Sequence, residues 1–260
     1  MISIKDYIFS KLNRTDCHVN QYGKNAFPEY TAFSFGSIIF VDNDIKNFDE
    51  PLYPYYKQMK DNFTHFTHNY VAGIGKDVQE TKKICKDFNI SFLGEVKCFK
   101  HYTDSENKEH TYENYDIALC DELKNIPMFV HYDLIDDDTR LREIIEFNPD
   151  RPVILCHCGM NDLDDKEFAF EKAIDLQHKY NNLWLEISWT AWEYIGKDHR
   201  KMSRIDTDRL LLGSDFSKFT THKEIKYTLD CFDYWTKKIS IKRNIIKLLR
   251  NYGKPQLNEY

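Results

Sequence analysis

The segment Leu210-Leu211-Leu212-Gly213-Ser214-Asp215 is the most informative about the fold, because it joins a short apolar run directly to a carboxylate. An apolar run of about four to eight residues, bounded by turn residues, is typical of a buried strand. A strand-like run ending in an acid or imidazole side chain occurs four more times, at His18, Glu95, His131 and His157. The carboxyl ends of the strands in a parallel barrel meet at one rim, so the pattern predicts a common site there.

Apolar runs of this kind alternate with longer amphipathic stretches along the chain. We expect strands over 14–20, 37–42, 70–74, 91–98, 127–132, 153–158, 183–188 and 209–215. We expect helices over 77–88, 115–123, 138–147, 165–180, 222–235 and 239–252. Such repeated strand–helix units indicate an α/β fold with a parallel sheet. With 260 residues and 42% hydrophobic content, the chain is predicted to form one (β/α)8 TIM barrel, a single domain over 1–260.

Charge and cysteine usage exclude some functions and favour others. Lys and Arg number 36 against 42 Asp and Glu, giving a net charge of −6, which does not favour a nucleic-acid-binding surface, although a local basic groove stays open. Seven cysteines, an odd number, indicate reduced thiols and a cytoplasmic protein. We expect no membrane segment, because no apolar run approaches the roughly 20 residues that span a bilayer. The beginning of the chain also has no secretion-signal pattern.

The residue spacing suggests which side chains face the barrel axis. Residues two apart on a strand share a face, so Asn20 should lie beside His18, and Lys97 beside Glu95. Glu95 could bridge two metal ions as a carboxylate, and Lys97 could do so if carbon dioxide carboxylated its amine. We favour Glu95, which needs no modification. The structural alternative is an internal Glu95–Lys97 salt bridge.

The remaining rim residues are expected to share the same chemistry. His131 and His157 end apolar runs, where an imidazole is an expensive polar group unless it has a partner such as a metal ion. Asp215 could bind metal, take a proton from bound water and pass it to a leaving group. A single histidine at a strand end is more often a hydrogen-bonded structural group, but five such positions favour metal binding. Cys156 and Cys158 flank His157, and their parity predicts that both pack in the core on the opposite face.

These segments resemble the amidohydrolase superfamily, in particular its amidohydrolase-related branch of metal-dependent hydrolases. Asp16-Cys17-His18-Val19-Asn20 follows the Asp-x-His-x-His pattern of that family's first strand except at Asn20. The segments 126–131, 152–159, 182–188 and 208–215 are similar to its fifth to eighth strands. The resemblance implies a divalent metal, zinc first with manganese or magnesium as alternatives, as one or two ions held by His18, Asn20, Glu95, His131, His157 and Asp215. Because an amide is a poor zinc ligand, Asn20 leaves open a weak or empty metal position, an oxygen ligand or lost activity.

A second relative is the TatD-type deoxyribonuclease, because Gly94-Glu95-Val96 is similar to its Gly-Glu-Ile-Gly segment. That family follows the glutamate with Gly-Leu-Asp, whereas this chain continues with Lys97-Cys98-Phe99, which counts against the nuclease. A nonoxidative decarboxylase of the same superfamily and a catalytically silent barrel that acts as a binding component also remain open.

The leading expectation is a metal-dependent hydrolase that cleaves a small amide, lactone or ester with a metal-activated water. Asp215 is the expected catalytic residue. Glu186, Ser188, Trp189 and Trp192 are candidates for the pocket wall after the seventh strand. The expected partner is a small-molecule substrate, and a homo-oligomer is compatible with the sequence.

Overall fold

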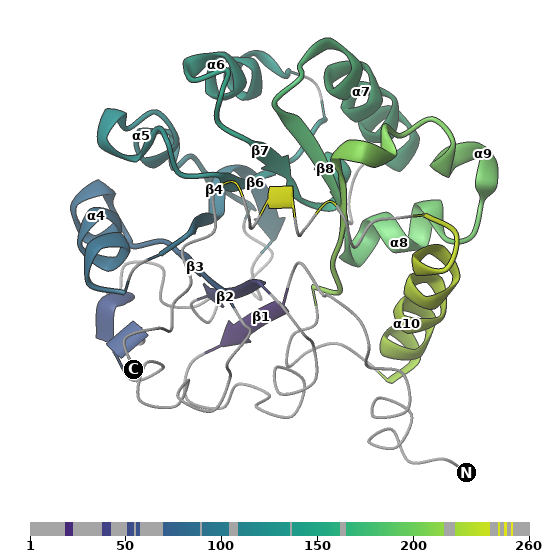
Figure 1. The fold of residues 1–260 in the computed structure, drawn as a ribbon, viewed down its shortest axis with the longest axis horizontal. Coiled ribbons are helices and arrows are strands. Elements are labelled where there is room, and N and C mark those ends of the chain that lie inside the picture. Colours follow the sequence, from purple (N-terminus) through teal and green to yellow (C-terminus); the bar gives the residue numbers. More distant parts are fainter. Residues whose placement is uncertain are drawn as a thin grey trace.

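The computed structural model describes residues 19–22, 38–42, 51–54, 56–57, 70–88, 90–103, 109–135, 137–161, 165–215, 222–239, 244, 247–248 and 251. The strands lie at the centre of the molecule and the helices lie outside them (Figure 1). Among the described residues, no helix is both long enough and apolar enough to cross a bilayer.

Eight described strands form one parallel series, each paired with the next. In spatial order they are β1 (Val19–Tyr22), β2 (Ile38–Asp42), β3 (Tyr70–Gly73), β4 (Phe92–Thr103), β6 (Met128–Tyr132), β7 (Val153–Leu155), β8 (Leu183–Ile187) and β9 (Leu210–Leu212). Spatial order therefore follows chain order, as expected of strands joined by crossover connections. This confirms the predicted (β/α)8 barrel.

The described helices surround the strands, and three of them begin at an aspartate whose side chain caps the first turn. The helices are α4 (Val78–Asp87), α5 (Tyr115–Ala118), α6 (Thr139–Phe147), α7 (Lys166–Lys179), α8 (Trp189–Ile195), α9 (His199–Met202) and α10 (His222–Thr236). The Asp77 side chain accepts from the backbone of Glu80 at the start of α4, and Asp165 accepts from two amides at the start of α7. Each such cap contributes about 1 kcal/mol.

Two hydrophobic clusters lie on the two sides of the sheet. Successive residues of β7 alternate between them, with Val153 and Leu155 in the larger cluster and Ile154 in the smaller. The smaller cluster is Ala72, Phe92, Phe129, Ile154, Cys156, Trp184, Leu211 and Leu248. Because neighbouring strands contribute to it at alternate positions, we identify it as the packed barrel interior. The larger cluster lies between the strands and the helices.

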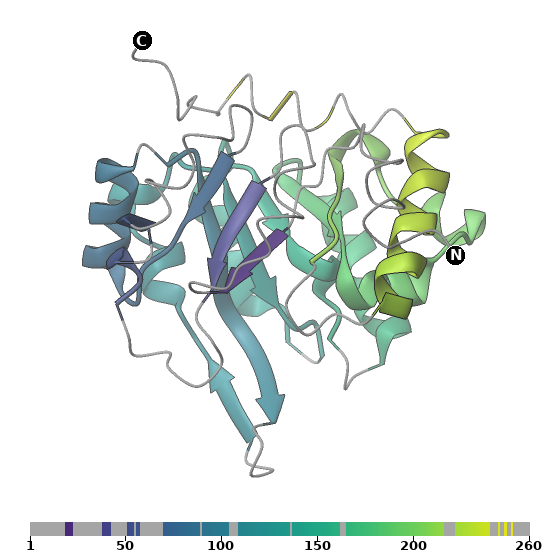
Figure 2. The same ribbon diagram turned by 90° about the horizontal axis from the view of Figure 1, so that it is seen from below.

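The structure differs from the predicted elements most at β4. This strand continues to Thr103 rather than ending at residue 98, and it pairs antiparallel with β5 (Glu109–Tyr112), which was not predicted. Figure 2 shows this β4–β5 ribbon extending beyond the body of the molecule. Sequence reasoning missed it because the segment from Lys100 to Tyr112 is too polar to resemble a buried strand. The helix expected over 115–123 is α5 followed by a separate 3-10 turn, η2 (Asp121–Leu123).

Candidate metal centre

A β-bulge turns Glu95 toward the barrel interior. Leu93 pairs with Met128 and Val96 pairs with Val130, so three steps along β4 match two along β6. Phe92 belongs to the interior cluster, and in a regular strand Glu95, three residues later, would point to the opposite side. The extra residue changes this alternation, as bulges do when they redirect a side chain. Glu95 is consequently buried, with 8% of its surface exposed, and it reaches two histidines.

His131 lies on β6 between two carboxylates. Its Nδ1 is 2.8 Å from Glu95 Oε1, and its Nε2 is 3.1 Å from Asp133 Oδ1. All three side chains are buried. The imidazole at the end of this apolar run therefore has a polar partner for each ring nitrogen, which offsets the cost of burying it.

His157 follows β7 in a short 3-10 turn, η3 (Cys156–Gly159), rather than ending a longer strand. Its φ is 54° and that of Cys158 is 53°, both in the left-handed region that non-glycine residues rarely adopt. The Glu186 carboxylate accepts a hydrogen bond from the His157 backbone amide at 3.0 Å. This turn brings His157 Nε2 to 3.2 Å from Glu95 Oε1, and the two imidazole rings are 5.1 Å apart.

The same turn changes the predicted positions of the two neighbouring cysteines. Both are buried as expected, but Cys156 belongs to the interior cluster and Cys158 to the outer cluster. The prediction that both cysteines share one face is wrong, because residues 156–159 form a turn and do not alternate as a strand does. Burial raises the pKa of both thiols well above the ordinary value.

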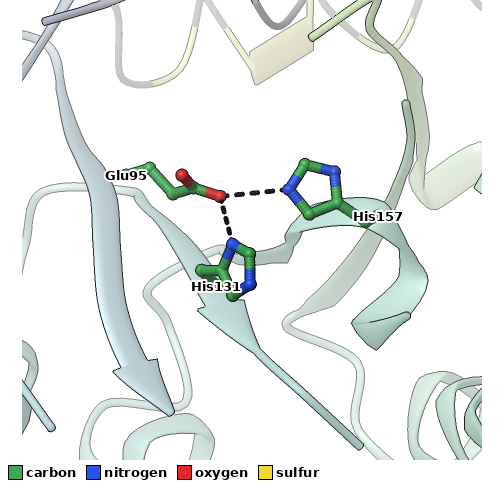
Figure 3. A group of neighbouring side chains, drawn as sticks. All are labelled: Glu95, His131 and His157. Carbon is green, nitrogen blue, oxygen red and sulfur yellow. Dashed lines mark hydrogen bonds and ion pairs between the residues drawn. The ribbon is translucent and has the colours of Figure 1, made fainter. Parts of the chain in front are cut away.

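One oxygen of Glu95 faces both imidazoles, as Figure 3 shows. Burial by itself raises the pKa of Glu95, but the charge and hydrogen bond of His131, together with those of His157, lower it well below its ordinary value. The carboxylate is therefore ionised in spite of its burial. A metal ion at this position would replace the imidazole protons that face this oxygen, and the ionised carboxylate would offset its charge.

The donor set fits a divalent transition metal. One ligand atom from each of Glu95, His131 and His157 lies within 4.8 Å of the other two. Two imidazole nitrogens and one carboxylate oxygen are ligands that zinc accepts at about 2.0–2.2 Å, and three protein ligands leave a fourth position for water or substrate. These residues, which the sequence predicted as ligands, are thus brought together in one buried group.

Asp215 lies on the other side of His157. Its Oδ2 is 3.8 Å from His157 Nδ1, whereas Glu95 is next to Nε2. The Asp215 backbone has a φ of 54°, and 11% of its side chain is exposed. It belongs to the same neighbourhood but not to the closest group of ligand atoms, so its roles as ligand and catalytic residue remain predictions.

The candidates after β8 have different surroundings. Glu186 and Ser188 are completely buried behind His157, where Ser188 Oγ lies 2.7 Å from His157 Nδ1 and donates to Glu186 Oε2 at 2.8 Å. Trp189 is 37% exposed, and its ring meets that of His157 edge-on at 5.4 Å, a place compatible with the predicted pocket wall. Trp192 is not part of such a wall: it is fully buried and donates to the carbonyl oxygen of Gly213.

Three further candidates are less well defined. His18 lies outside the described residues. Asn20 belongs to β1, where it pairs with Phe40 of β2, but its side chain is not among those described. Lys97 pairs with His131 in the β4–β6 register and is 9% exposed. Their roles as ligands or bridging groups stay predictions.

Sequence reasoning missed Asp133, which contacts His131 directly. Its signal was present, because it follows His131 by two residues and residues two apart on a strand share a face. The apolar run ends at His131, so Asp133 looked like the first residue of the following loop.

Comparisons with known proteins identify the fold. No protein-family model and no curated protein matches the sequence. A zinc-bound amidohydrolase from Burkholderia multivorans is similar in structure, with a TM-score of 0.54, 12% identity and coverage of 93% of this chain and 99% of that one. Amidohydrolase 2 from Bifidobacterium longum subsp. infantis has a TM-score of 0.52 at 10% identity, covering 93% and 98% of the two chains. An uncharacterised TIM-barrel protein from Bordetella bronchiseptica has a TM-score of 0.53 at 13% identity, covering 86% and 80%. The chain thus has the barrel fold found in these amidohydrolases.

Proposed function

We propose that this protein is a metal-dependent hydrolase of the amidohydrolase superfamily that acts on a small amide, lactone or ester. The observation that carries the proposal is the shared position of Glu95 Oε1, 2.8 Å from one imidazole nitrogen and 3.2 Å from another. The fold of the zinc-bound amidohydrolase supports it. We propose zinc as the metal, with manganese or magnesium as alternatives.

The ligand roles follow from which atoms face the common position. Glu95 would contribute Oε1, His131 its Nδ1 and His157 its Nε2. A divalent ion held there would act as a Lewis acid, lowering the pKa of a water and polarising the substrate's carbonyl oxygen. Burial of all three ligands strengthens their interaction with the ion.

Asp215 would manage the proton in the reaction. Its carboxylate is partly exposed at the end of β9, so Oδ2 can both meet a substrate and receive a proton. Trp189, which is also partly exposed and contacts the His157 ring, would border the substrate. A positioned general acid–base contributes about 100- to 10,000-fold to a rate.

A cytoplasmic location is part of the proposal. The six described cysteines, which are Cys85, Cys98, Cys120, Cys156, Cys158 and Cys231, form no disulfide with one another. Reduced thiols of this kind are typical of a reducing compartment.

The test is to strip the purified protein with a chelator, reload it with zinc, manganese or magnesium, and assay it against lactones, amides and esters. We expect turnover to return with at least one metal. Asp215→Asn should retain the metal and lose at least ~100-fold in kcat. The matched control is Glu193→Gln, an exposed carboxylate paired with Lys166, which should behave like wild type.

The alternatives predict different results in the same assay. Turnover of aromatic carboxylic acids alone would indicate a decarboxylase, and turnover of phosphodiesters alone would indicate a nuclease. Substoichiometric metal with no turnover of any substrate would indicate a silent barrel, and the hydrolase proposal would be abandoned.

A further inference from the structure

Each of the two histidines in the candidate metal centre has a buried acid on the side away from Glu95. Behind His131, Asp133 lies 3.1 Å from Nε2. Behind His157, Ser188 lies 2.7 Å from Nδ1, and the serine hydroxyl donates to Glu186 at 2.8 Å. Asp133, Glu186 and Ser188 are at most 1% exposed.

We propose that Asp133 and the Ser188–Glu186 pair are positioning residues that determine which nitrogen of each histidine binds the metal. The inference rests on the proposed metal site at Glu95, His131 and His157. It assigns these buried groups to the metal centre, where they would orient its ligands without touching the ion.

The number of available hydrogens determines which groups donate and which accept in the hydrogen bonds behind His157. Glu186 Oε2 accepts from Ser188 Oγ and from the His157 backbone amide. A serine hydroxyl has a single hydrogen, so Ser188 Oγ must accept from the ring when it donates to Glu186. The His157 ring therefore keeps a proton on Nδ1, and Nε2, which faces Glu95, is the nitrogen that would give up its proton to bind an ion.

The same reasoning applies to His131 with the nitrogens exchanged. An ionised Asp133 can only accept, so it holds a ring proton on Nε2, and Nδ1, which faces Glu95, is the nitrogen that would give up its proton to bind an ion. The two histidines would therefore bind one ion through different nitrogens, Nδ1 of His131 and Nε2 of His157. Each ring is also prevented from rotating by its partner.

A contact with the backbone of His157 also supports a positioning role for Glu186. Its Oε2 atom links the Ser188 hydroxyl to the amide of His157, a residue with a φ of 54°. The carboxylate thereby fixes both the ring and the main chain of one ligand. A glutamate serving only to fill the core would have no need of contacts to both parts of the same residue.

The experiment compares zinc affinity, by competition with a chromophoric chelator, in wild type and in the variants Ser188→Ala, Glu186→Gln and Asp133→Asn. We expect each variant to lose about 10- to 100-fold in zinc affinity. Ser188→Thr keeps the hydroxyl and should rescue most of the loss, whereas Glu193→Gln should bind like wild type. Thermal melting of each metal-free variant shows whether it folds.

A spectroscopic measurement separates positioning from a purely structural role. In the zinc-loaded wild type, long-range ¹H–¹⁵N spectra of the imidazoles should show a protonated Nε2 in His131 and a protonated Nδ1 in His157. The pattern of His157 should change in Ser188→Ala and be restored in Ser188→Thr. Even if Ser188→Ala failed to fold, the wild-type spectrum and Ser188→Thr would still test the assignment.

The possible failures are distinguishable. A wild-type protein that binds none of zinc, manganese and magnesium would contradict the proposed function itself. A wild type that binds zinc, with variants that lose melting temperature but keep zinc affinity, would overturn the positioning role alone. Protons on the opposite nitrogens in the zinc-loaded protein, Nδ1 of His131 and Nε2 of His157, would overturn the positioning role as well.

Discussion

The barrel interior has two layers on the same strands, one apolar and one ionisable. Phe129 and Trp184 pack in the apolar layer, and two residues further along each strand His131 and Glu186 belong to the ionisable layer. All four are buried, so burial does not distinguish the layers. The difference lies in the partners: the apolar layer is held by packing, whereas the ionisable layer is held by hydrogen bonds around Glu95.

The stability of the fold and the proposed metal chemistry therefore depend on successive layers of side chains along the same strands. Removing atoms from the apolar layer should change stability and leave the metal site in place. Removing a carboxylate from the ionisable layer should affect the metal site first.

The largest expected effect is on stability in the apolar layer. Phe129→Ala removes a fully buried ring that packs edge-on against Phe92 at 6.1 Å between centroids. We expect the free energy of unfolding to fall by about 3–5 kcal/mol, measured by urea denaturation. If the variant folds, its zinc affinity should change far less than its stability. If the free energy of zinc binding fell by as much as the free energy of unfolding, the two layers would not be separable.

The next effect should appear in the ionisable layer. Glu95→Gln keeps the shape of the side chain but removes the charge that faces both imidazoles. We expect a fall in zinc affinity of about 100-fold or more, because a ligand should matter at least as much as its supporting residues. Calorimetric titration measures it. Zinc affinity equal to that of wild type would remove Glu95 from the metal site.

A smaller change tests the boundary between the layers. Ile154→Val deletes one methylene group from the apolar layer on the strand that leads to His157. We expect a loss of about 0.5–1.5 kcal/mol in unfolding free energy. Zinc affinity should stay within the error of measurement, and a change beyond ~3-fold would indicate strong coupling across the layers.

The smallest effect concerns the two cysteines beside His157. Burial raises the pKa of Cys156 and Cys158, so the reactive thiolate is depleted in the folded protein even at mildly alkaline pH. Mass spectrometry after treatment with iodoacetamide at pH 8 should find the partly exposed Cys85 modified before either of them. Modification of Cys156 before Cys85 would mean that the segment around His157 opens readily to solvent.

Sequence reasoning reached the barrel and the two histidines because both depend on local patterns. Short apolar runs marked β6 and β7, and an imidazole at the end of such a run required a partner. Glu95 was selected as a carboxylate in a strand-like segment. The sequence could not show how it reaches His131, because the bulge in β4 depends on its register with β6.

Other features depend on tertiary structure in the same way. The left-handed turn at His157 is held by Glu186 from β8, twenty-nine residues along the chain, so strand parity failed for Cys156 and Cys158. The predicted strand to residue 158 ends instead at Leu155. Asp133 is the exception, because its two-residue spacing from His131 was visible in the sequence.

The most direct test of the account is anomalous X-ray diffraction from crystals of the zinc-loaded protein, measured on either side of the zinc absorption edge. We expect a zinc peak about 2.0–2.2 Å from a Glu95 oxygen, Nδ1 of His131 and Nε2 of His157. A fully loaded protein whose zinc lies elsewhere, with the hydrogen bonds of Glu95 to both imidazoles intact, would contradict it.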